Sequence, residues 1–133
     1  MSTADVETIR AGVAALNRGD VEALVATLDP EVELIPLRAV LDGSVYRGHD
    51  GLRRWLDDMS EDWVGFQLGL EEVRALGGGQ VLVQAVMRMR GRSSGVAVDA
   101  PAAWLCDMRD GRVSRIRFFG DPAAALAAAG PGG

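Results

Sequence analysis

The most informative part of this chain is residues 46–59, with the sequence Tyr46-Arg47-Gly48-His49-Asp50-Gly51-Leu52-Arg53-Arg54-Trp55-Leu56-Asp57-Asp58-Met59. A short β-prone segment ends at Gly48, and the spacing of Leu52, Trp55 and Met59 predicts an amphipathic helix directly after it. Asp50 stands where an N-cap or first-turn acid stabilises a helix. The preceding residues predict helices and one strand, and the following residues predict a long antiparallel sheet. We therefore expect the helix to lie as a lid across a curved sheet, with a cavity beneath it.

Length and composition bound the class of protein. The chain has 133 residues, of which 48% are hydrophobic and 25% charged, as in a single globular domain. We expect this domain to span residues 1–130, with residues 131–133 as a disordered tail. The net charge of −5 argues against nucleic acid as a partner, because such a surface repels phosphate.

Further limits come from what the sequence lacks. No apolar run approaches the roughly 18 residues of a membrane span, and the N-terminus has neither the basic start nor the apolar stretch of a signal peptide. These features predict a cytoplasmic protein without a membrane contact. Cys106 is the single cysteine and His49 the single histidine, so we expect no disulfide within the chain, no zinc site, and no other cofactor.

Apolar spacing before residue 46 predicts two helices and a strand. Gly19 suits the end of the first helix, and Asp20 suits the N-cap of the second. The second helix should run to about residue 28 and stop before Pro30, which disfavours helical geometry in the residue before it. Alternation predicts a short strand over residues 31–36, and residues 38–44 resemble a loop.

After the lid helix, alternation of apolar and polar residues predicts strands over residues 66–76, 80–90, 96–108 and 112–119. Asp110-Gly111 is a strong hairpin signal, and Pro101 indicates an edge or bulge position in its strand. Asp121-Pro122 pairs an N-cap with a first-turn proline, which predicts a short alanine-rich helix that stops at Gly130.

This order of elements resembles the nuclear-transport-factor-2-like superfamily, also called the SnoaL-like or cystatin-like cone fold. Local sequences carry the resemblance over residues 3–130: Asn17-Arg18-Gly19-Asp20, Tyr46-Arg47-Gly48-His49-Asp50-Gly51-Leu52-Arg53, Asp110-Gly111-Arg112-Val113 and Arg117-Phe118-Phe119-Gly120-Asp121-Pro122. The resemblance implies an α+β fold, a cone-shaped barrel of a curved, mostly antiparallel sheet around N-terminal helices and a lid helix, with a short C-terminal helix. Members include polyketide cyclases, ketosteroid isomerases, epoxide hydrolases, dehydratases and non-catalytic binders, so the family does not select one chemistry.

The resemblance also implies a pocket between the helices and the concave face of the sheet. We expect this pocket to bind a small, mostly apolar molecule. The residues expected to form it are Ile35, Tyr46, Trp55, Met59, Trp63, Phe66, Met87, Trp104, Cys106, Ile116 and Phe118. The alternative is that these side chains simply fill the core.

Catalytic candidates are few. Ketosteroid-isomerase-like members carry a general base before a proline of the first strand, and the matching residue here is Ile35, which cannot abstract a proton. The position of their second acid, which acts as an oxyanion donor, is occupied here by Trp104. His49 and Tyr46 are then the candidates for acid/base work. We expect a structural role for His49. For Tyr46 two alternatives stay open: its hydroxyl points into the pocket, or its side chain covers the lid helix.

The convex face of the predicted sheet is a second candidate for a functional surface. Leu82, Val86, Ala103 and Leu105 form its apolar centre in the predicted register, with charged residues around it: Arg88, Arg90, Asp99, Asp107, Arg115 and Arg117. The resemblance implies a homodimer through this face. In the same register, the charges of an epoxide-hydrolase-like Asp–Arg–Asp group would lie outside the pocket, as surface or interface ion pairs.

Three functions stay open at this point. An ionisable pair inside the pocket would favour a cofactor-independent acid/base enzyme of the cyclase, isomerase, hydratase or epoxide hydrolase type. A wholly apolar pocket would favour a binder of small molecules. A filled pocket would favour a protein-interaction subunit that uses the sheet face.

Overall fold

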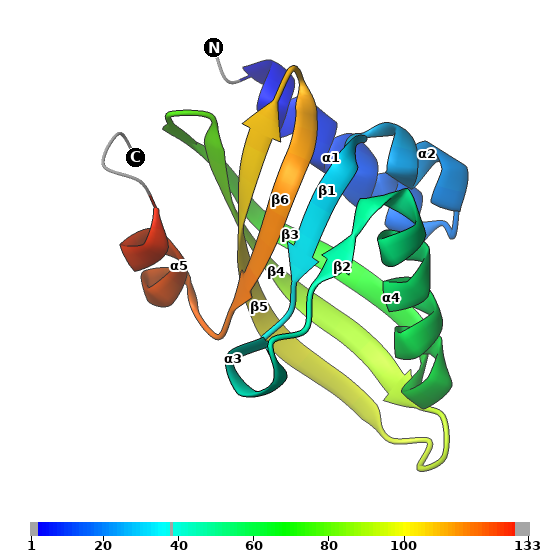
Figure 1. Ribbon diagram of the computed structural model, residues 1–133. Coiled ribbons are helices and arrows are strands. Elements are labelled where there is room, and N and C mark those ends of the chain that lie inside the picture. Colours follow the sequence, from blue (N-terminus) through cyan, green and yellow to red (C-terminus); the bar gives the residue numbers. More distant parts are fainter. Residues whose placement is uncertain (1–2, 38, 130–133) are drawn as a thin grey trace.

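Six strands form one curved sheet, in the order β2-β1-β6-β5-β4-β3 (Figure 1). The computed structural model describes residues 3–37 and 39–129, so the predicted tail at 131–133 lies outside the described residues. The strands are β1 (Leu28–Ile35), β2 (Tyr46–Arg47), β3 (Trp63–Gly77), β4 (Gln80–Gly91), β5 (Ala97–Arg109) and β6 (Arg112–Phe119). The helices are α1 (Thr3–Asn17), α2 (Val21–Ala26), α3 (Ala39–Asp42), α4 (Gly48–Asp62) and α5 (Pro122–Ala128).

Neighbouring strands run antiparallel, except for β1 and β6, which run parallel. The sheet ends at β2 on one side and at β3 on the other, so it is curved but is not closed into the barrel that the resemblance implied. The main core joins α1, α2 and α4 to the concave face, while α5 packs on the opposite face (Figure 1). The predicted α+β fold is therefore confirmed, with an open sheet.

The first strand begins earlier than the sequence pattern predicts. Helix α2 ends at Ala26, and β1 already starts at Leu28. The cause is pairing with β6, because the Val113 N–H donates to the Thr27 carbonyl at 3.0 Å and Leu28 lies opposite Val113. The register with β6 then shifts between Leu28 and Glu33, so Pro30 lies at an irregular point of the strand.

Two further predictions from local sequence concern residues 38–44 and Pro101. The segment predicted as a loop contains the short helix α3, with residue 38 outside the described part. Pro101 lies in β5 opposite Val86 of β4, while β6 begins to pair with β5 only at Ala103. The proline therefore occupies a stretch of β5 that pairs with a strand on one side, which agrees with the edge position that its sequence indicated.

A side chain closes part of the free edge of β3. The amide of Asn17, the last residue of α1, accepts from the Leu68 N–H at 2.8 Å and donates to the Leu68 carbonyl at 2.9 Å. Gln67 also donates to the Asn17 carbonyl at 2.7 Å. The Asn17 side chain thus pairs with the strand as a neighbouring backbone would, and it ties the end of α1 to the sheet.

The two faces of the sheet follow the predicted alternation. Trp104 pairs with Val83 and belongs to the concave core. Leu82, Ala103 and Leu105 lie on the other face and are 0% exposed within the single chain. Leu82 and Ala103 pack against Ala125 of α5. Three of the four residues predicted as the apolar centre of a homodimer surface are thus covered within the single chain, and Val86 alone of them keeps some exposed surface, while the homodimer itself stays a prediction.

No helix of the described residues combines the length and the apolar composition needed to cross a membrane.

Candidate functional site

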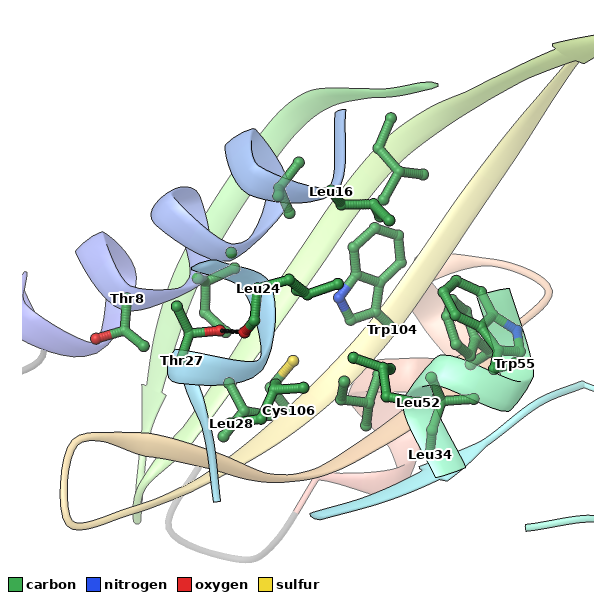
Figure 2. Close-up of a pocket in the computed structure, with 17 residues that line it drawn as sticks. Thr8, Leu16, Leu24, Thr27, Leu28, Leu34, Leu52, Trp55, Trp104 and Cys106 are labelled. Atoms are coloured by element: carbon green, nitrogen blue, oxygen red, sulfur yellow. Dashed lines mark hydrogen bonds between the residues drawn. The ribbon is translucent and has the colours of Figure 1, made fainter. Parts of the chain in front are cut away.

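A cavity of about 70 Å³, here called the inner cavity, lies between α1, α2, α4 and the concave face of the sheet (Figure 2). Apolar side chains make up nearly all of its wall. Its lining residues are Thr8, Ile9, Gly12, Val13, Leu16, Leu24, Thr27, Leu28, Leu34, Leu52, Trp55, Leu68, Trp104, Cys106, Val113, Ile116 and Phe118. The aliphatic stripe of α1 that contributes to it was readable from helical spacing, although the sequence analysis did not assign it to the site.

The wall of the inner cavity carries few polar atoms. The Thr8 hydroxyl donates to the Ala4 carbonyl at 3.0 Å, and the Thr27 hydroxyl donates to the Leu24 carbonyl at 2.7 Å. The Trp104 indole nitrogen and the Cys106 sulfur lie at the same space (Figure 2). Among the lining residues that the structure describes, there is no Asp, Glu, His, Lys or Arg.

Cys106 is the one ionisable group at the inner cavity wall among the described residues. Burial raises the pKa of its thiol well above the ordinary range, and the nearby charge of Asp107 raises it further. The neighbouring Trp104 side chain acts in the opposite direction. The thiol is therefore protonated at neutral pH and acts as a small apolar group rather than as a nucleophile.

A second space, here called the outer hollow, has a volume of about 300 Å³. It lies between the second half of α4, the start of β3 and the turn after β4. Its lining residues are Leu16, Trp55, Leu56, Met59, Ser60, Trp63, Val64, Gly65, Phe66 and Arg92. Leu16 and Trp55 line both spaces, so these two side chains form the boundary between the inner cavity and the outer hollow.

Four aromatic rings from different elements pack in a continuous row. Phe66 meets Trp55 edge-on at 6.1 Å between centroids, and Trp55 stacks on Phe118 at 6.1 Å. Phe118 in turn lies 5.5 Å from Trp104. The row leads from the outer hollow to the inner cavity, which gives both spaces an aromatic wall.

The residues expected to form one pocket are therefore divided between two spaces. Trp55, Trp104, Cys106, Ile116 and Phe118 line the inner cavity. Met59, Trp63 and Phe66 line the outer hollow together with Trp55. Met87 packs against the main core without lining either space.

The expectation that Ile35 lines the pocket is wrong. Ile35 pairs with Arg117, whereas Leu34 pairs with Ile116 and lines the inner cavity. Successive strand residues face opposite sides, so Leu34 on the concave face puts Ile35 on the other face. The residue that does face the cavity is also aliphatic, and it cannot act as a general base.

Both acid/base candidates, His49 and Tyr46, make hydrogen bonds outside the inner cavity and the outer hollow. His49 Nε2 lies 3.0 Å from the Leu28 carbonyl, a contact in which the ring nitrogen donates and which ties the first turn of α4 to β1. The Tyr46 hydroxyl donates to Asp58 at 2.5 Å, so it lies along the lid helix. Neither residue lines the inner cavity or the outer hollow.

The charged residues of the convex face pair with one another. Asp107 accepts from Arg115 at 2.7 Å and from Gln80 at 3.0 Å, and Arg117 lies 3.8 Å away. These groups do not line either space, as the predicted strand alternation required. In the described part of the chain, no group of three His, Cys, Asp or Glu side chains is arranged to hold a metal ion.

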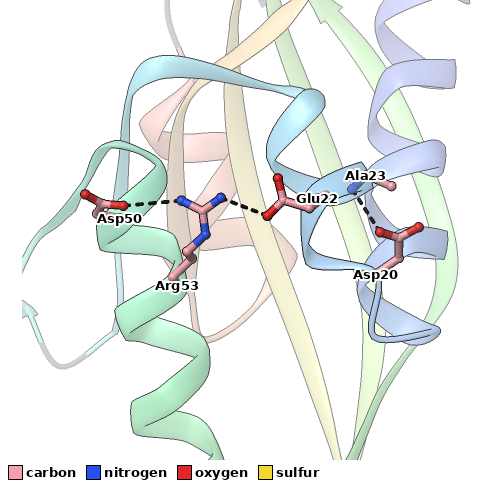
Figure 3. A network of polar contacts seen from close by, with 5 residues as sticks. All are labelled: Asp20, Glu22, Ala23, Asp50 and Arg53. Atoms are coloured by element: carbon pink, nitrogen blue, oxygen red, sulfur yellow. Dashed lines mark hydrogen bonds and ion pairs between the residues drawn. The ribbon is translucent and has the colours of Figure 1, made fainter.

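Polar contacts at its first turns hold the lid helix α4 in place (Figure 3). Arg53 donates to Glu22 of α2 at 3.0 Å and to Asp50 at 3.2 Å, so one guanidinium joins the two helices. Asp50 is a first-turn acid of α4, as expected, but its side chain pairs with Arg53 instead of capping the helix.

The Asp20 side chain caps α2 by accepting from the Ala23 N–H at 3.1 Å (Figure 3). We expect Asp20→Ala to lower the free energy of unfolding by about 1 kcal/mol in denaturant melts. The same change at Asp57, whose side chain is exposed in the second half of α4, should cost less than about 0.5 kcal/mol. Equal losses for the two variants would contradict the importance of this cap.

These features together define a class: a cone-like α+β domain with an apolar interior under a lid helix. The family model for the SnoaL-like domain matches residues 9–116. The chain belongs to this family, as the sequence resemblance predicted.

Individual relatives agree with this assignment. An uncharacterized protein of Mycobacterium tuberculosis is 36% identical over 124 residues, covering 91% of this chain and 92% of that protein. The crystal structure of TerC with polyporic acid has a TM-score of 0.80 at 22% identity, covering 94% of this chain and 97% of that chain. A nuclear-transport-factor-2-like protein of unknown function from Burkholderia pseudomallei has a TM-score of 0.79 at 18% identity, covering 94% and 96%. Both structures share the fold with this chain.

Proposed function

We propose that this protein binds a small, mostly apolar molecule in the space under the lid helix. The observation that carries the proposal is the wall of the inner cavity, which is built from apolar side chains contributed by helices and sheet alike. Apolar, partly preformed spaces with few polar groups are typical of small-molecule sites. TerC, a protein with the same fold, has been crystallised with polyporic acid, which supports small-molecule binding as a use of this architecture.

The volumes limit how the ligand lies. The inner cavity, at about 70 Å³, is smaller than the roughly 150 Å³ cavity that holds a benzene molecule. The outer hollow adds about 300 Å³. A ligand of more than a few heavy atoms therefore occupies the outer hollow and reaches the inner cavity past Trp55 and Leu16, which line both.

One polar group at the inner cavity gives the site a preference. The Trp104 indole is 5% exposed, and its N–H donates to the Cys106 sulfur, which is a weak acceptor. Figure 2 shows its nitrogen at the cavity wall. A ligand with a carbonyl or ether oxygen at its inner end would offer this N–H a stronger acceptor than the thiol, which favours it over a pure hydrocarbon.

An acid/base enzyme is the second function considered from the sequence. Such an enzyme needs an ionisable group within reach of the substrate. Cys106, protonated because of its raised pKa, is the one such group among the described residues of the inner cavity wall. A binder is therefore the better supported proposal, while the homodimer and the cytoplasmic location stay predictions.

The proposal is tested with methyl cinnamate, a flat and uncharged ester, in a titration followed by ¹H–¹⁵N NMR. We expect saturable shifts at residues of α4, β5 and β6 around Trp55 and Trp104. Val13→Phe, which fills the inner cavity, should weaken binding at least tenfold, and Val86→Phe is the matched control on the convex face. The absence of saturable binding at millimolar ester would overturn the proposal.

A further inference from the structure

Arg92 lies in the turn between β4 and β5 and lines the outer hollow. Its side-chain Nε donates to the Ser60 carbonyl at 2.9 Å, and its backbone N–H donates to the Asp62 carbonyl at 2.8 Å. Two bonds therefore anchor this arginine to the last turn of α4. No sequence pattern indicated this role for Arg92, because both partners lie about thirty residues earlier in the chain.

The guanidinium of Arg92 makes no ion pair with any residue that the structure describes. No carboxylate oxygen of those residues lies within 4.0 Å of it, in contrast to Arg53 and Arg115. Its Nη groups make no hydrogen bond in the same part of the chain, since only Nε and the backbone N–H are engaged. An arginine with both Nη groups available presents the paired donors that match a carboxylate.

The rest of the outer hollow is mostly apolar. Trp55, Met59, Trp63 and Phe66 provide its aromatic and thioether surface. A wall of this kind with a single cationic group selects amphipathic molecules, since burial of the apolar body supplies affinity and the charge fixes the orientation. The anchored Nε holds the guanidinium in place before a ligand arrives, which lowers the entropy lost on binding.

We propose that the outer hollow is the site for the carboxylate end of a flat, apolar monocarboxylate, with the carboxylate on the Nη groups of Arg92. This inference rests on the proposed function, because the apolar body of the same ligand extends past Trp55 towards the inner cavity. The exposed acids Asp57, Glu61 and Asp62 of α4 lie in the same helix end and do not line the hollow. Their charge, with the net charge of −5, disfavours a dianion such as a phosphate monoester, so the ligand class is a monoanion.

The experiment compares cinnamate with methyl cinnamate, which share one body and differ in the charge. In NMR titrations at low ionic strength, the wild-type protein should bind cinnamate about tenfold more tightly than the ester, as expected for one added charge-assisted pair. Arg92→Gln should remove this preference, so that cinnamate binds no more tightly than the ester. Arg90→Gln is the matched control, because Arg90 belongs to the same hairpin, bonds to the Gly95 carbonyl and does not line the outer hollow.

The outcomes separate this inference from the proposed function. Equal wild-type affinities for cinnamate and its ester would overturn the carboxylate site and leave the apolar site standing. A preference for cinnamate that survives in Arg92→Gln would also overturn it, since another group would then hold the carboxylate. Binding of neither probe would overturn both proposals. Arg92→Lys keeps the charge but loses the paired donors, and its preference should fall between those of the wild type and Arg92→Gln.

Discussion

Replacing Trp104 by alanine is expected to lower the free energy of unfolding by about 3 kcal/mol. Trp104 is 5% exposed, lies on β5 near the middle of the sheet and packs its ring 5.5 Å from that of Phe118. The loss should fall at the low end of the range for large aromatic residues, because part of the ring already borders the inner cavity and makes no contact there. Urea melts of wild type and variant, with equal m-values, measure the difference.

The matched control is Trp63→Ala. Trp63 is the same residue type but is half-buried at the outer hollow, so its loss should be less than half as large. Trp104→Ala should also enlarge the inner cavity and shift ligand preference to bulkier molecules. An equal loss at both tryptophans, with no change in ligand preference, would contradict the placement of Trp104 as the residue that limits the inner cavity.

Replacing Gly51 by alanine is expected to lower the free energy of unfolding by about 2 kcal/mol, although alanine is the better helix former. A Cβ atom at Gly51 would lie 2.9 Å from the carbonyl carbon and 3.3 Å from the Cα atom of Tyr46. These are backbone atoms of β2, so α4 itself must move away from the sheet to make room. The gain in helix propensity, about 1 kcal/mol, does not offset the free-energy cost of this displacement.

Gly120→Ala serves as the control for Gly51→Ala. A Cβ atom at Gly120 would meet no atom within 4 Å, so this variant should stay within about 0.5 kcal/mol of the wild type. Thermal or urea melts of the two variants give the comparison. A stabilised Gly51→Ala protein would show that α4 does not lie against β2 as closely as described.

Local patterns predicted much of this fold, and the reason is the short range of the physics involved. The alternation in residues 80–90 placed Val81, Val83 and Ala85 on the concave face, where they are buried. The strand β6 has the predicted bounds, since the Asp110-Gly111 turn and the alternation after it act within a few residues. The cap at Asp20 was likewise a local feature.

Other features depended on contacts between distant parts of the chain. The early start of β1 follows from parallel pairing with β6, about eighty residues later. No local pattern encodes that register. The same holds for the Tyr46 hydroxyl on Asp58 and for Arg92 on the end of α4, which meet only when the helix and the sheet are assembled.

The candidate site shows the same division. The family resemblance implied a pocket, and the alternation and helical spacing of large apolar side chains indicated which tryptophans would be buried around it. The division of that space into an inner cavity and an outer hollow was decided only in the tertiary structure, where Trp55 and Leu16 from separate helices meet. Cavity volume depends on how side chains from several elements interdigitate, and a change of one ångström in that packing opens or closes it.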